Sequence, residues 1–268
     1  MKKRLLSAIL SFCMLLTMAP TVAFAAEDDE GNTPPATSGT CGAEGNADSV
    51  KWNFNSSTGT LKISGTGKMS NLNNSTETEN ISDGAGTYPW ANLKDSITKI
   101  EIDDGVTSIG SKAFIAYTNV TSVNIGKDVS EIGVGALSQL SACTTFSVSS
   151  ENNHFMTDAT GVLFDHSKTK LIAFPCGSSV TTYEIPDTVT TISYGAFSRA
   201  ASLKTITIPK SSSLSTIGYG AFAFTTALET VNVIPASVET IGDIPFAQSG
   251  VKYIYCADKD TKDRIQNK

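Results

Sequence analysis

Residues 97–114 read ITKIEIDDGVTSIGSKAF, and residues 120–137 repeat the pattern as VTSVNIGKDVSEIGVGAL. Both follow I-x-x-I-x-I…V-x-x-I-G-x-x-A-F, with other apolar residues at some of the hydrophobic positions. Three more full copies and one partial copy start 23 or 25 residues apart, at Val180, Leu203, Leu228 and Val251. Self-similarity at this period is the signature of a solenoid, in which each repeat forms one coil.

The parts of the repeat have distinct structural roles. The alternating I-x-I segment predicts a short strand with one face turned inward. Glycine in the Ile-Gly step permits either a positive φ or a close approach of two backbones. The Ala-Phe pair places a small and a large side chain in the interior. Stacked coils should align one ladder of large side chains, made of Phe114, Leu137, Phe197, Phe222 and Phe246.

A single coil cannot be stable on its own. It offers about five large apolar side chains, worth roughly 1.5–3 kcal/mol each when buried. Ordering its backbone costs about 1–2 kcal/mol per residue, which is more than this gain. The coils must therefore stack, and the predicted fold class is a β-rich solenoid, a right-handed superhelix of coils of ~23 residues. The fourth coil has two extra residues at 211–213 and the fifth has one near Pro235, and we expect turns to absorb them.

Residues 143–179 interrupt the period. Cys143 starts a coil, but a polar stretch at 150–154 follows, and then two apolar segments at 161–164 and 171–175 flank a polar turn. Two apolar segments around a short polar turn are typical of a β-hairpin. We predict a variant coil that carries a hairpin.

The first 25 residues have the composition of a signal peptide. A basic triplet at residues 2–4 precedes an apolar segment at 5–18, and residues 23–25 form an A-x-A cleavage site. No second apolar stretch approaches the roughly 20 residues that a transmembrane helix needs. We therefore predict residues 1–25 as a removed signal peptide and expect an extracellular protein, secreted or associated with the cell surface.

The rest of the chain must include caps, because a solenoid exposes apolar surface at both ends. The predicted segments are a flexible leader at 26–39, an N-terminal β-rich cap at 40–96, the solenoid at 97–256 and a C-terminal capping segment at 257–268. Within the first cap, residues 50–54 and 60–64 predict a β-hairpin, and residues 70–87 predict a polar loop. Trp90 should cover the first coil, and the last segment should form a short polar helix that packs through Ile265.

The charge excludes one class of partner. The chain carries −6, and removal of a signal segment with three basic and no acidic residues leaves about −9. A nucleic-acid-binding protein needs a basic stripe, and this sequence has none, so we expect no nucleic acid partner.

Four cysteines remain after cleavage, which permits two disulfides in an exported protein. Cys143 and Cys256 occupy positions that hold Leu, Ile or Val in other coils, so both are interpreted as small buried hydrophobic residues. Cys41 opens the N-terminal cap and Cys176 follows the hairpin. The disulfide status of the four stays open.

Together these patterns resemble the BspA-like leucine-rich repeat family. The resemblance is carried by the coil pattern, by the N-N-x-x-F…G-V-L-F hairpin variant, and by Cys41-Gly42, Trp52, residues 59–69 and Pro89-Trp90 at the start. It covers about residues 40–256, with Leu137, Ser193 and Pro245 as departures from the usual residues. It implies a leucine-rich-repeat-like solenoid displayed or released by a bacterium. The family's association with adhesion implies an extracellular protein or glycan partner, such as host matrix, mucin or a bacterial surface.

No motif for catalysis, cofactor or metal binding is present. G-x-S-x-G, C-x-x-C, H-E-x-x-H, the P-loop and G-x-G-x-x-G are all missing. The two histidines, His154 and His166, sit among polar turn residues and are predicted to be exposed. Asp103-Asp104-Gly105 resembles part of a calcium loop but is interpreted as the step from strand to turn. A pair of carboxylates for glycoside cleavage stays open.

The leading hypothesis is a non-enzymatic binding or adhesion module that uses no cofactor. Its candidate binding face consists of the outward residues of the strands, which are Lys99, Glu101, Ser122, Asn124, Thr145, Ser147, Thr182, Glu184, Thr205, Thr207, Thr230, Asn232, Tyr253 and Tyr255. Small hydroxyl residues also favour exposed strands without any binding role. The alternative is a secreted hydrolase or its substrate-docking subunit, which a deep pocket with two carboxylates or a His–nucleophile pair would favour.

Overall fold

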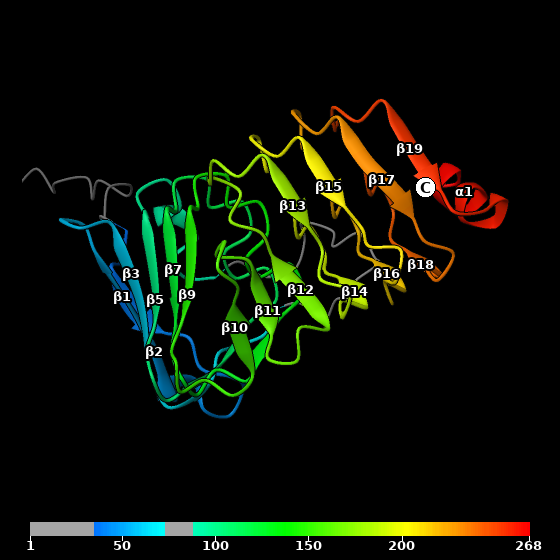
Figure 1. The fold of residues 1–268 in the computed structure, drawn as a ribbon. Helices are drawn as coiled ribbons and strands as arrows, with labels where there is room; N and C mark the ends of the chain where they lie inside the picture. Colours follow the sequence, from blue (N-terminus) through cyan, green and yellow to red (C-terminus); the bar gives the residue numbers. More distant parts are fainter. Residues whose placement is uncertain (1–34, 73–87) are drawn as a thin grey trace, which may run out of the picture. The chain divides into compact units, whose positions relative to one another are not determined.

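The computed structural model describes residues 35–72 and 88–268. The described residues belong to one compact unit, a β-solenoid of stacked coils (Figure 1). The signal peptide, most of the leader and most of the polar loop expected at 70–87 lie outside the described residues. Residues 38 and 39, which the sequence placed in the flexible leader, belong to a strand that pairs with the cap.

A first ladder of strands forms one side of the coils (Figure 1). Its six-stranded part, in the order β1-β2-β3-β5-β7-β9, contains β1 (Ser38–Thr40), β2 (Val50–Asn55), β3 (Thr60–Gly65), β5 (Lys99–Ile102), β7 (Ser122–Ile125) and β9 (Thr145–Val148). Its four-stranded part contains β13 (Thr182–Glu184), β15 (Thr205–Thr207), β17 (Thr230–Ile234) and β19 (Tyr253–Cys256). The expected hairpin of the cap is β2–β3, and β3 then pairs in parallel with β5, so the cap and the first coil share one sheet.

A second ladder forms another side of the coils. Its three-stranded part contains β4 (Gly67–Lys68), β6 (Val106–Ile109) and β8 (Glu131–Ile132). Its six-stranded part contains β10 (Phe155–Thr157), β11 (Leu163–Asp165), β12 (Lys170–Ala173), β14 (Thr191–Ile192), β16 (Thr216–Ile217) and β18 (Thr240–Ile241). The variant coil carries the predicted hairpin as β11–β12, and β10 adds a third antiparallel strand that the sequence did not predict.

Both ladders are interrupted at the variant coil. β9 and β13 belong to different sheets, and so do β8 and β12. The buried side chains divide at the same place into two clusters, one extending from the cap to Phe155 and Ala173, the other from Val162 to Ile241. We call this interruption, between residues 130–138 and residues 155–194, the seam.

The ladder of large side chains is longer than predicted and is divided in two. In the first part, Trp90 of the cap stacks on Phe114 with 5.6 Å between ring centroids. In the second part, the hairpin contributes Phe174, and successive centroids are 5.2, 5.2 and 5.0 Å apart along Phe174, Phe197, Phe222 and Phe246. The sequence placed Trp90 over the first coil without including it in the ladder, and it missed Phe174, because neither belongs to a regular repeat.

Glycine in the Ile-Gly step is required by close packing of backbones. Gly133 and Gly242 do not have positive φ, but a Cβ at either position would overlap with the backbone of the preceding coil, at Ser111 and Tyr219. The glycine N–H groups continue the ladder, since Gly133 donates to Ile109 O at 2.8 Å. Of the two explanations that the sequence left open, close approach is confirmed.

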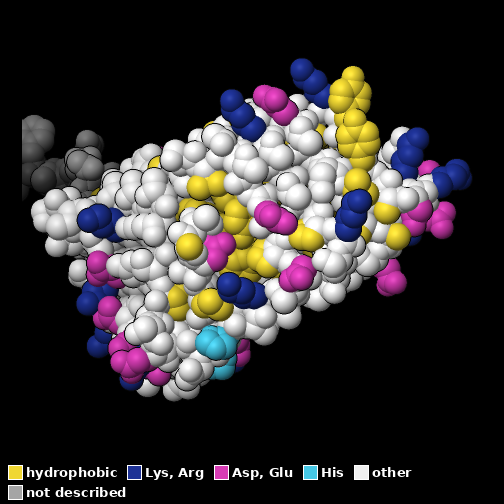
Figure 2. Space-filling model, in the orientation of Figure 1, with side chains coloured by type: hydrophobic (Ala, Val, Ile, Leu, Met, Phe, Trp, Pro, Cys, Tyr) yellow, Lys and Arg dark blue, Asp and Glu magenta, His cyan; other side chains and the backbone are white. Residues whose placement is uncertain are grey.

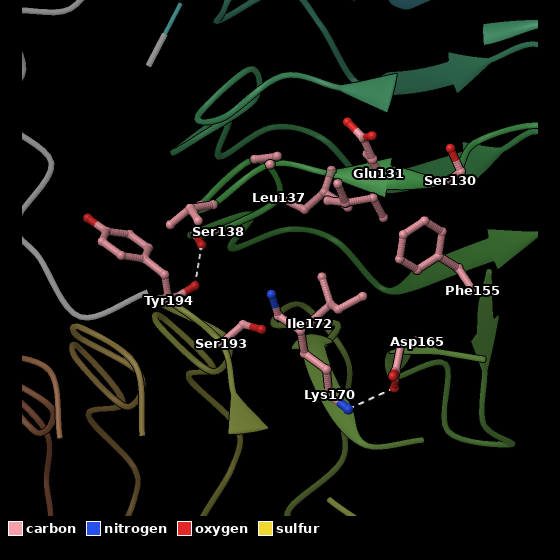
Figure 3. A pocket seen from close by; sticks show the side chains of 15 residues that line it. Ser130, Glu131, Leu137, Ser138, Phe155, Asp165, Lys170, Ile172, Ser193 and Tyr194 are labelled. Atoms are coloured by element: carbon pink, nitrogen blue, oxygen red, sulfur yellow. Dashed lines mark hydrogen bonds between the residues drawn. The ribbon is translucent and has the colours of Figure 1, made fainter. Parts of the chain in front are cut away.

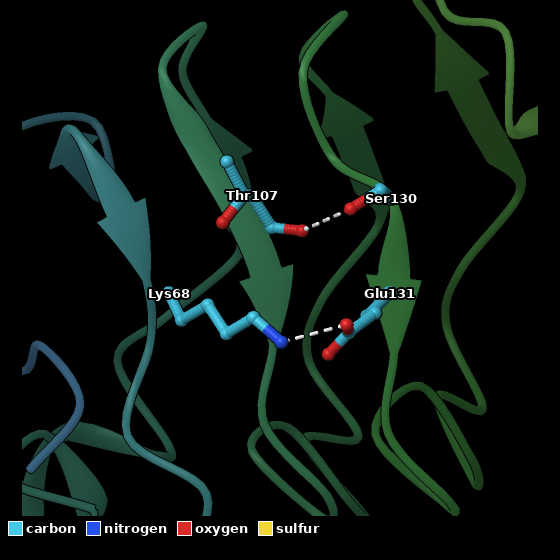
Figure 4. Close-up of polar contacts among 4 residues, drawn as sticks. All are labelled: Lys68, Thr107, Ser130 and Glu131. Atoms are coloured by element: carbon cyan, nitrogen blue, oxygen red, sulfur yellow. Dashed lines mark hydrogen bonds and ion pairs between the residues drawn. The ribbon is translucent and has the colours of Figure 1, made fainter.

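Hydroxyl side chains link each coil to the one before it. Thr121 Oγ1 donates to Thr98 O at 3.0 Å, and Ser130 Oγ donates to Thr107 O at 3.2 Å (Figure 4). The donor and the acceptor are 23 residues apart in both cases. Lys68 Nζ also reaches Glu131 Oε1 at 2.7 Å from β4 to β8 (Figure 4), but both side chains are more than half exposed, so this pair contributes little to stability.

The fifth coil departs from the repeat at one position, because the pattern I-x-x-I-x-I counted from Leu228 predicts an inward Val233. Val233 is 41% exposed, whereas Ile234 is fully buried, because the register between β17 and β19 shifts between Val231 and Val233. The extra residue of this coil is therefore absorbed as a bulge within the strand, and the expectation of a longer turn near Pro235 is wrong.

Both ends of the stack are covered by other parts of the chain. Trp90 is fully buried and stacks on Tyr88 with 5.1 Å between ring centroids. Its Nε1 donates a hydrogen bond to Ala113 O at 3.3 Å. The short 3-10 helices η1 (Ala47–Ser49) and η2 (Ala91–Leu93) belong to this end of the chain. At the other end, α1 (Lys259–Gln266) is capped by Asp258 and packs through Ile265.

Phe222→Ala should lower the free energy of unfolding by about 3–5 kcal/mol, because it removes a fully buried rung and leaves a cavity between two stacked rings. Thr207→Ala on the outer side of β15 is the control and should cost less than about 1 kcal/mol. Urea unfolding of both variants tests this, and equal midpoints would show that the fourth coil is wrongly aligned.

Trp90→Ala should also cost about 3–5 kcal/mol, and it should increase binding of a hydrophobic dye because the apolar end of the first coil becomes accessible. Tyr253→Ala is the matched aromatic control, since its side chain is 70% exposed and should leave stability within about 0.5 kcal/mol. Thermal unfolding and dye fluorescence measure both effects. Unchanged dye binding in Trp90→Ala would argue against its role as a lid.

Candidate functional site

The first part of the predicted binding face forms an ordered grid. Lys99, Ser122 and Thr145 are successive partners across β5, β7 and β9, and Glu101, Asn124 and Ser147 form the next row. All six are exposed or half-exposed. The parallel pairing places equivalent residues of neighbouring coils side by side, so this patch presents two rows of polar groups.

The second part lies beyond the hairpin coil and is a separate patch. Thr182, Thr205, Thr230 and Tyr253 are successive partners, and Glu184 pairs with Thr207 in the next row. The fourteen predicted residues therefore do not form one continuous ladder, because β9 and β13 are in different sheets. The hairpin coil divides the face, and this division is visible only in the three-dimensional structure.

Asn232 has a different role from its neighbours on this face. Its Oδ1 accepts the Ile208 N–H at 2.7 Å and its Nδ2 donates to Ile208 O at 2.9 Å. The side chain thus replaces the backbone pairing that the bulge in β17 removes. Its place on the face is taken by Val233, which is the partner of Tyr255 on β19.

The last strand exposes the largest apolar groups of the face. Tyr253 and Tyr255 are 70% and 59% exposed, and Val233 beside them is 41% exposed. Figure 2 shows hydrophobic side chains protruding at this end of the solenoid, over β17 and β19. Exposed tyrosines combine a large contact area with a hydroxyl group and are enriched at protein interfaces.

A wide, open hollow of about 670 Å³ lies at the ends of β5, β7 and β9. Asn124 and Ser147 of the predicted face line it together with Asp103 and Asp104. Asp103 pairs with Lys62 at 3.0 Å, and Asp104 Oδ1 accepts the Lys127 N–H at 2.9 Å. These contacts agree with the interpretation of residues 103–105 as the step from strand to turn.

A second, more enclosed cavity of about 250 Å³ lies at the seam, and we call it the seam cavity. Its lining includes Ile132, Leu137, Phe155, Lys170, Ile172 and Ser193. Figure 3 shows the ring of Phe155 on one side and the side chains of Lys170, Ile172 and Ser193 on the other. The sequence did not predict this cavity, because its walls come from residues about 60 positions apart that only the hairpin brings together.

Two carboxylates, Glu131 and Asp165, border the seam cavity, as the hydrolase alternative requires. The carboxylate of Glu131 is directed away from the cavity (Figure 3) and pairs with Lys68. Burial alone would raise the pKa of Asp165, but hydrogen bonds from Thr169, the Lys170 N–H and Ser167 lower it below its ordinary value. A glycosidase needs one carboxyl group with a raised pKa as general acid, whereas the pKa of Asp165 is lowered.

The other reactive side chains are not arranged for nucleophilic catalysis in the described part of the chain. His154 and His166 are exposed, as predicted, and in residues 35–72 and 88–268 neither imidazole hydrogen-bonds to a carboxylate or a hydroxyl group. Burial raises the pKa of the Cys41 and Cys143 thiols to about 12, so both stay protonated and are poor nucleophiles.

The four cysteines among the described residues are free thiols. Cys143 is fully buried, as its repeat position predicted, whereas Cys256 is only half-buried because β19 is the last strand of its sheet. Across the described ranges, no group of three His, Cys, Asp or Glu side chains is arranged to hold a metal ion. No helix in those ranges is long and apolar enough to cross a bilayer.

Two polar residues of the hairpin coil have structural roles that the sequence did not reveal. Asn152 is buried, donates from Nδ2 to Gly126 O and Val129 O at 2.8 and 2.9 Å, and accepts the N–H groups of His154 and Phe155. Asp158 accepts a hydrogen bond from the Tyr183 hydroxyl at 2.8 Å. In the sequence this stretch is only recognisable as polar, and an asparagine that satisfies four backbone groups gives the same signal as an exposed one.

The stacked parallel strands and the repeat that forms them define a leucine-rich-repeat solenoid. The chain belongs to the BspA type leucine-rich repeat family, whose model matches residues 84–159 and 167–265 with 6 copies. No curated protein matches it.

Several solved structures are similar in fold. A leucine-rich repeat protein from Eubacterium ventriosum is 22% identical, with a TM-score of 0.45 over 84% of this chain and 73% of that one. The pneumococcal vaccine antigen PcpA is 14% identical, with a TM-score of 0.48 over 79% and 80% of the two chains. A leucine-rich cell surface protein from Faecalibacterium prausnitzii is 15% identical, with a TM-score of 0.37 over 84% and 97%.

Asn232→Ala should lower the free energy of unfolding by about 1–3 kcal/mol, because it leaves the N–H and C=O groups of Ile208 without their partner. Asn124→Ala, at an exposed position of the same face, should change it by less than about 0.5 kcal/mol. Chemical denaturation compares the two variants. Equal stabilities would mean that the bulge in β17 does not depend on the asparagine.

Proposed function

We propose that this chain is an exported, non-enzymatic binding or adhesion module that presents its strand face to an extracellular protein or glycan. The observation that carries the proposal is the register of the outward residues, which places equivalent side chains of neighbouring coils in rows on an otherwise structural repeat. Membership of a repeat family of bacterial surface proteins supports the same function.

The two patches would contribute differently to binding. The first patch offers polar groups around an open hollow, which suits hydrogen bonding to a partner that lies flat against it. The second ends in Tyr253 and Tyr255, which are the best candidates for residues that dominate the binding energy. The hairpin coil between them would act as a spacer that sets their separation.

Export is part of the proposal and rests on residues 1–25. Their basic start, apolar segment and A-x-A site would direct the chain out of the cell and be removed there. The partner would then be met outside the cell, where host matrix proteins, mucins and bacterial surface glycans are the candidate classes.

A pull-down of the purified chain on host matrix proteins, mucins and bacterial surface glycans tests the proposed function. The double variant Tyr253→Ala/Tyr255→Ala should weaken capture by more than about tenfold, as expected for central aromatic residues of an interface. Ile244→Ser is the control, since it removes an exposed apolar side chain that does not lie on the strand face. Equal capture by all three proteins would exclude the second patch as the binding surface.

The absence of catalysis is tested with the histidines. His154→Gln/His166→Gln should leave stability within about 0.5 kcal/mol, because both side chains are exposed. The parent chain should show no turnover of peptide, ester or glycoside substrates. Turnover that disappears in the double variant would place an active site in the hairpin coil, and turnover that persists would point to carboxylates.

A further inference from the structure

The seam cavity exists because the hairpin coil replaces a regular coil. In the regular part of the solenoid, each turn donates to the next, as Phe114 N does to Ala136 O and Phe197 N to Ala221 O. Between the turns of the second and third coils, side chains make the bridges instead, since Ser138 Oγ donates to Tyr194 O at 2.8 Å (Figure 3) and Arg199 Nε donates to Gln139 Oε1 at 3.1 Å. The interruption leaves a space that regular stacking fills.

Ser193 lies at the edge of this space. It stands at the Ile-Gly step, where the other full coils have glycine because the preceding backbone is too close for a Cβ. At the third coil the preceding strand is β12 of the hairpin, and there is room for a side chain. The Ser193 residue is 5% exposed and lines the cavity, and its hydroxyl has no hydrogen-bond partner among the described residues.

A buried hydroxyl without a partner costs free energy unless a ligand or another group satisfies it. Rotation about one bond lets the Ser193 hydroxyl donate to or accept from a group in the cavity. Figure 3 shows this side chain directed toward Lys170 and Ile172, so the hydroxyl and the Lys170 ammonium lie on the same side of the space.

The opposite side of the cavity carries large apolar side chains beside Ser130 and Ser138. Phe155 presents its ring there and Leu137 lies on the same side (Figure 3). Ile132 adds to the apolar lining.

Three charged groups border the cavity. Glu131 is paired with Lys68 and directed away from the cavity, and the other two, Lys170 and Asp165, have opposite signs, so the cavity favours neither an anion nor a cation. Charged groups at the border also disfavour a hydrocarbon chain. The lining matches a small neutral molecule with one apolar face and an edge of hydroxyl groups.

We propose that the seam cavity binds a single ring of a neutral sugar. The C–H face of the ring packs on Phe155, and its hydroxyl groups bond with Ser193 and Lys170. The volume of about 250 Å³ lies below the roughly 300–1,000 Å³ typical of larger ligands, which limits the site to one ring. This site goes beyond the strand face and does not depend on it.

The two nearby carboxylates do not make the cavity a hydrolase site. Asp165 is held ionised by its hydrogen bonds, and Glu131 is paired with Lys68 on the outside. The sugar is therefore bound without a group positioned to protonate a leaving oxygen.

Saturation-transfer NMR on the purified chain, with a panel of methyl hexopyranosides and methyl N-acetylhexosaminides, tests the proposal. At least one glycoside should bind with a Kd in the millimolar range, as expected for a ligand of this size, and should be recovered unhydrolysed. Ser193→Gly should weaken binding about fivefold through loss of one hydrogen bond. Ile172→Phe, which fills the cavity, should abolish binding.

Glycine is the residue of the other coils at this step, so Ser193→Gly is expected to fold, and its thermal midpoint checks this. Thr207→Ala on the strand face is the matched control and should bind the glycoside as the parent does. Three outcomes would overturn the proposal. These are no binding of any glycoside, binding that both cavity variants retain, and binding of N-acetyl amino acid amides in place of sugars.

The two proposals fail in distinguishable ways. Loss of partner capture in Tyr253→Ala/Tyr255→Ala with an unchanged glycoside signal supports a cavity independent of the strand face. Glycoside binding that is lost in the tyrosine variant, and kept in Ser193→Gly and Ile172→Phe, would assign the sugar to the strand face and overturn the cavity site.

Discussion

The structure depends on the stacking of one coil on the next. A coil of about 23 residues has a strand whose N–H and C=O groups point along the solenoid axis and an apolar interior that is open at both ends. The neighbouring coils pair with the N–H and C=O groups of the strand, as β7 does with β5. They also cover the open apolar interior, as the stacked rings of Phe197 and Phe222 do. Even the hydroxyl side chains at the turns bond to the preceding coil. Close stacking in turn excludes any Cβ at the Ile-Gly step, which is why glycine recurs there.

The same constraint explains the ends and the interruption. Where no regular coil follows, something else must cover the apolar face, and Trp90 and Ile265 do so at the two ends. The hairpin coil does not stack completely on the neighbouring regular coils. The ladders of strands and the buried clusters both divide there, the bonds between turns are replaced by bonds of side chains such as Ser138, and a cavity with a buried hydroxyl at Ser193 remains. An irregular coil in a regular stack is thus the natural place for a specific small-molecule site.

The outward surface is under weaker constraint. Its residues are held in register by the parallel strands, but their chemistry is not needed for folding. Because the outward residues can vary without changing the fold, the same scaffold can carry different surfaces for different partners. The exceptions are residues such as Asn232, whose side chain substitutes for backbone pairing and is therefore structural although its position in the sequence looks identical to that of Asn124.

The repeat in the sequence was sufficient for the fold class, the inward residues of the regular coils, the hairpin of the cap and the terminal helix, because each depends on local periodicity or on a local capping signal. Alternation along a strand also indicated which side chains point away from the core, except at the bulge in β17. Tertiary structure alone decided that the face is divided, that Val233 and not Asn232 points outward, that Asn152 is buried, and that Trp90 and Phe174 are rungs of the ladder. It alone also created the seam cavity. These features depend on how the hairpin coil and the bulge meet neighbouring coils, and contacts between segments tens of residues apart leave no periodic signal in the sequence.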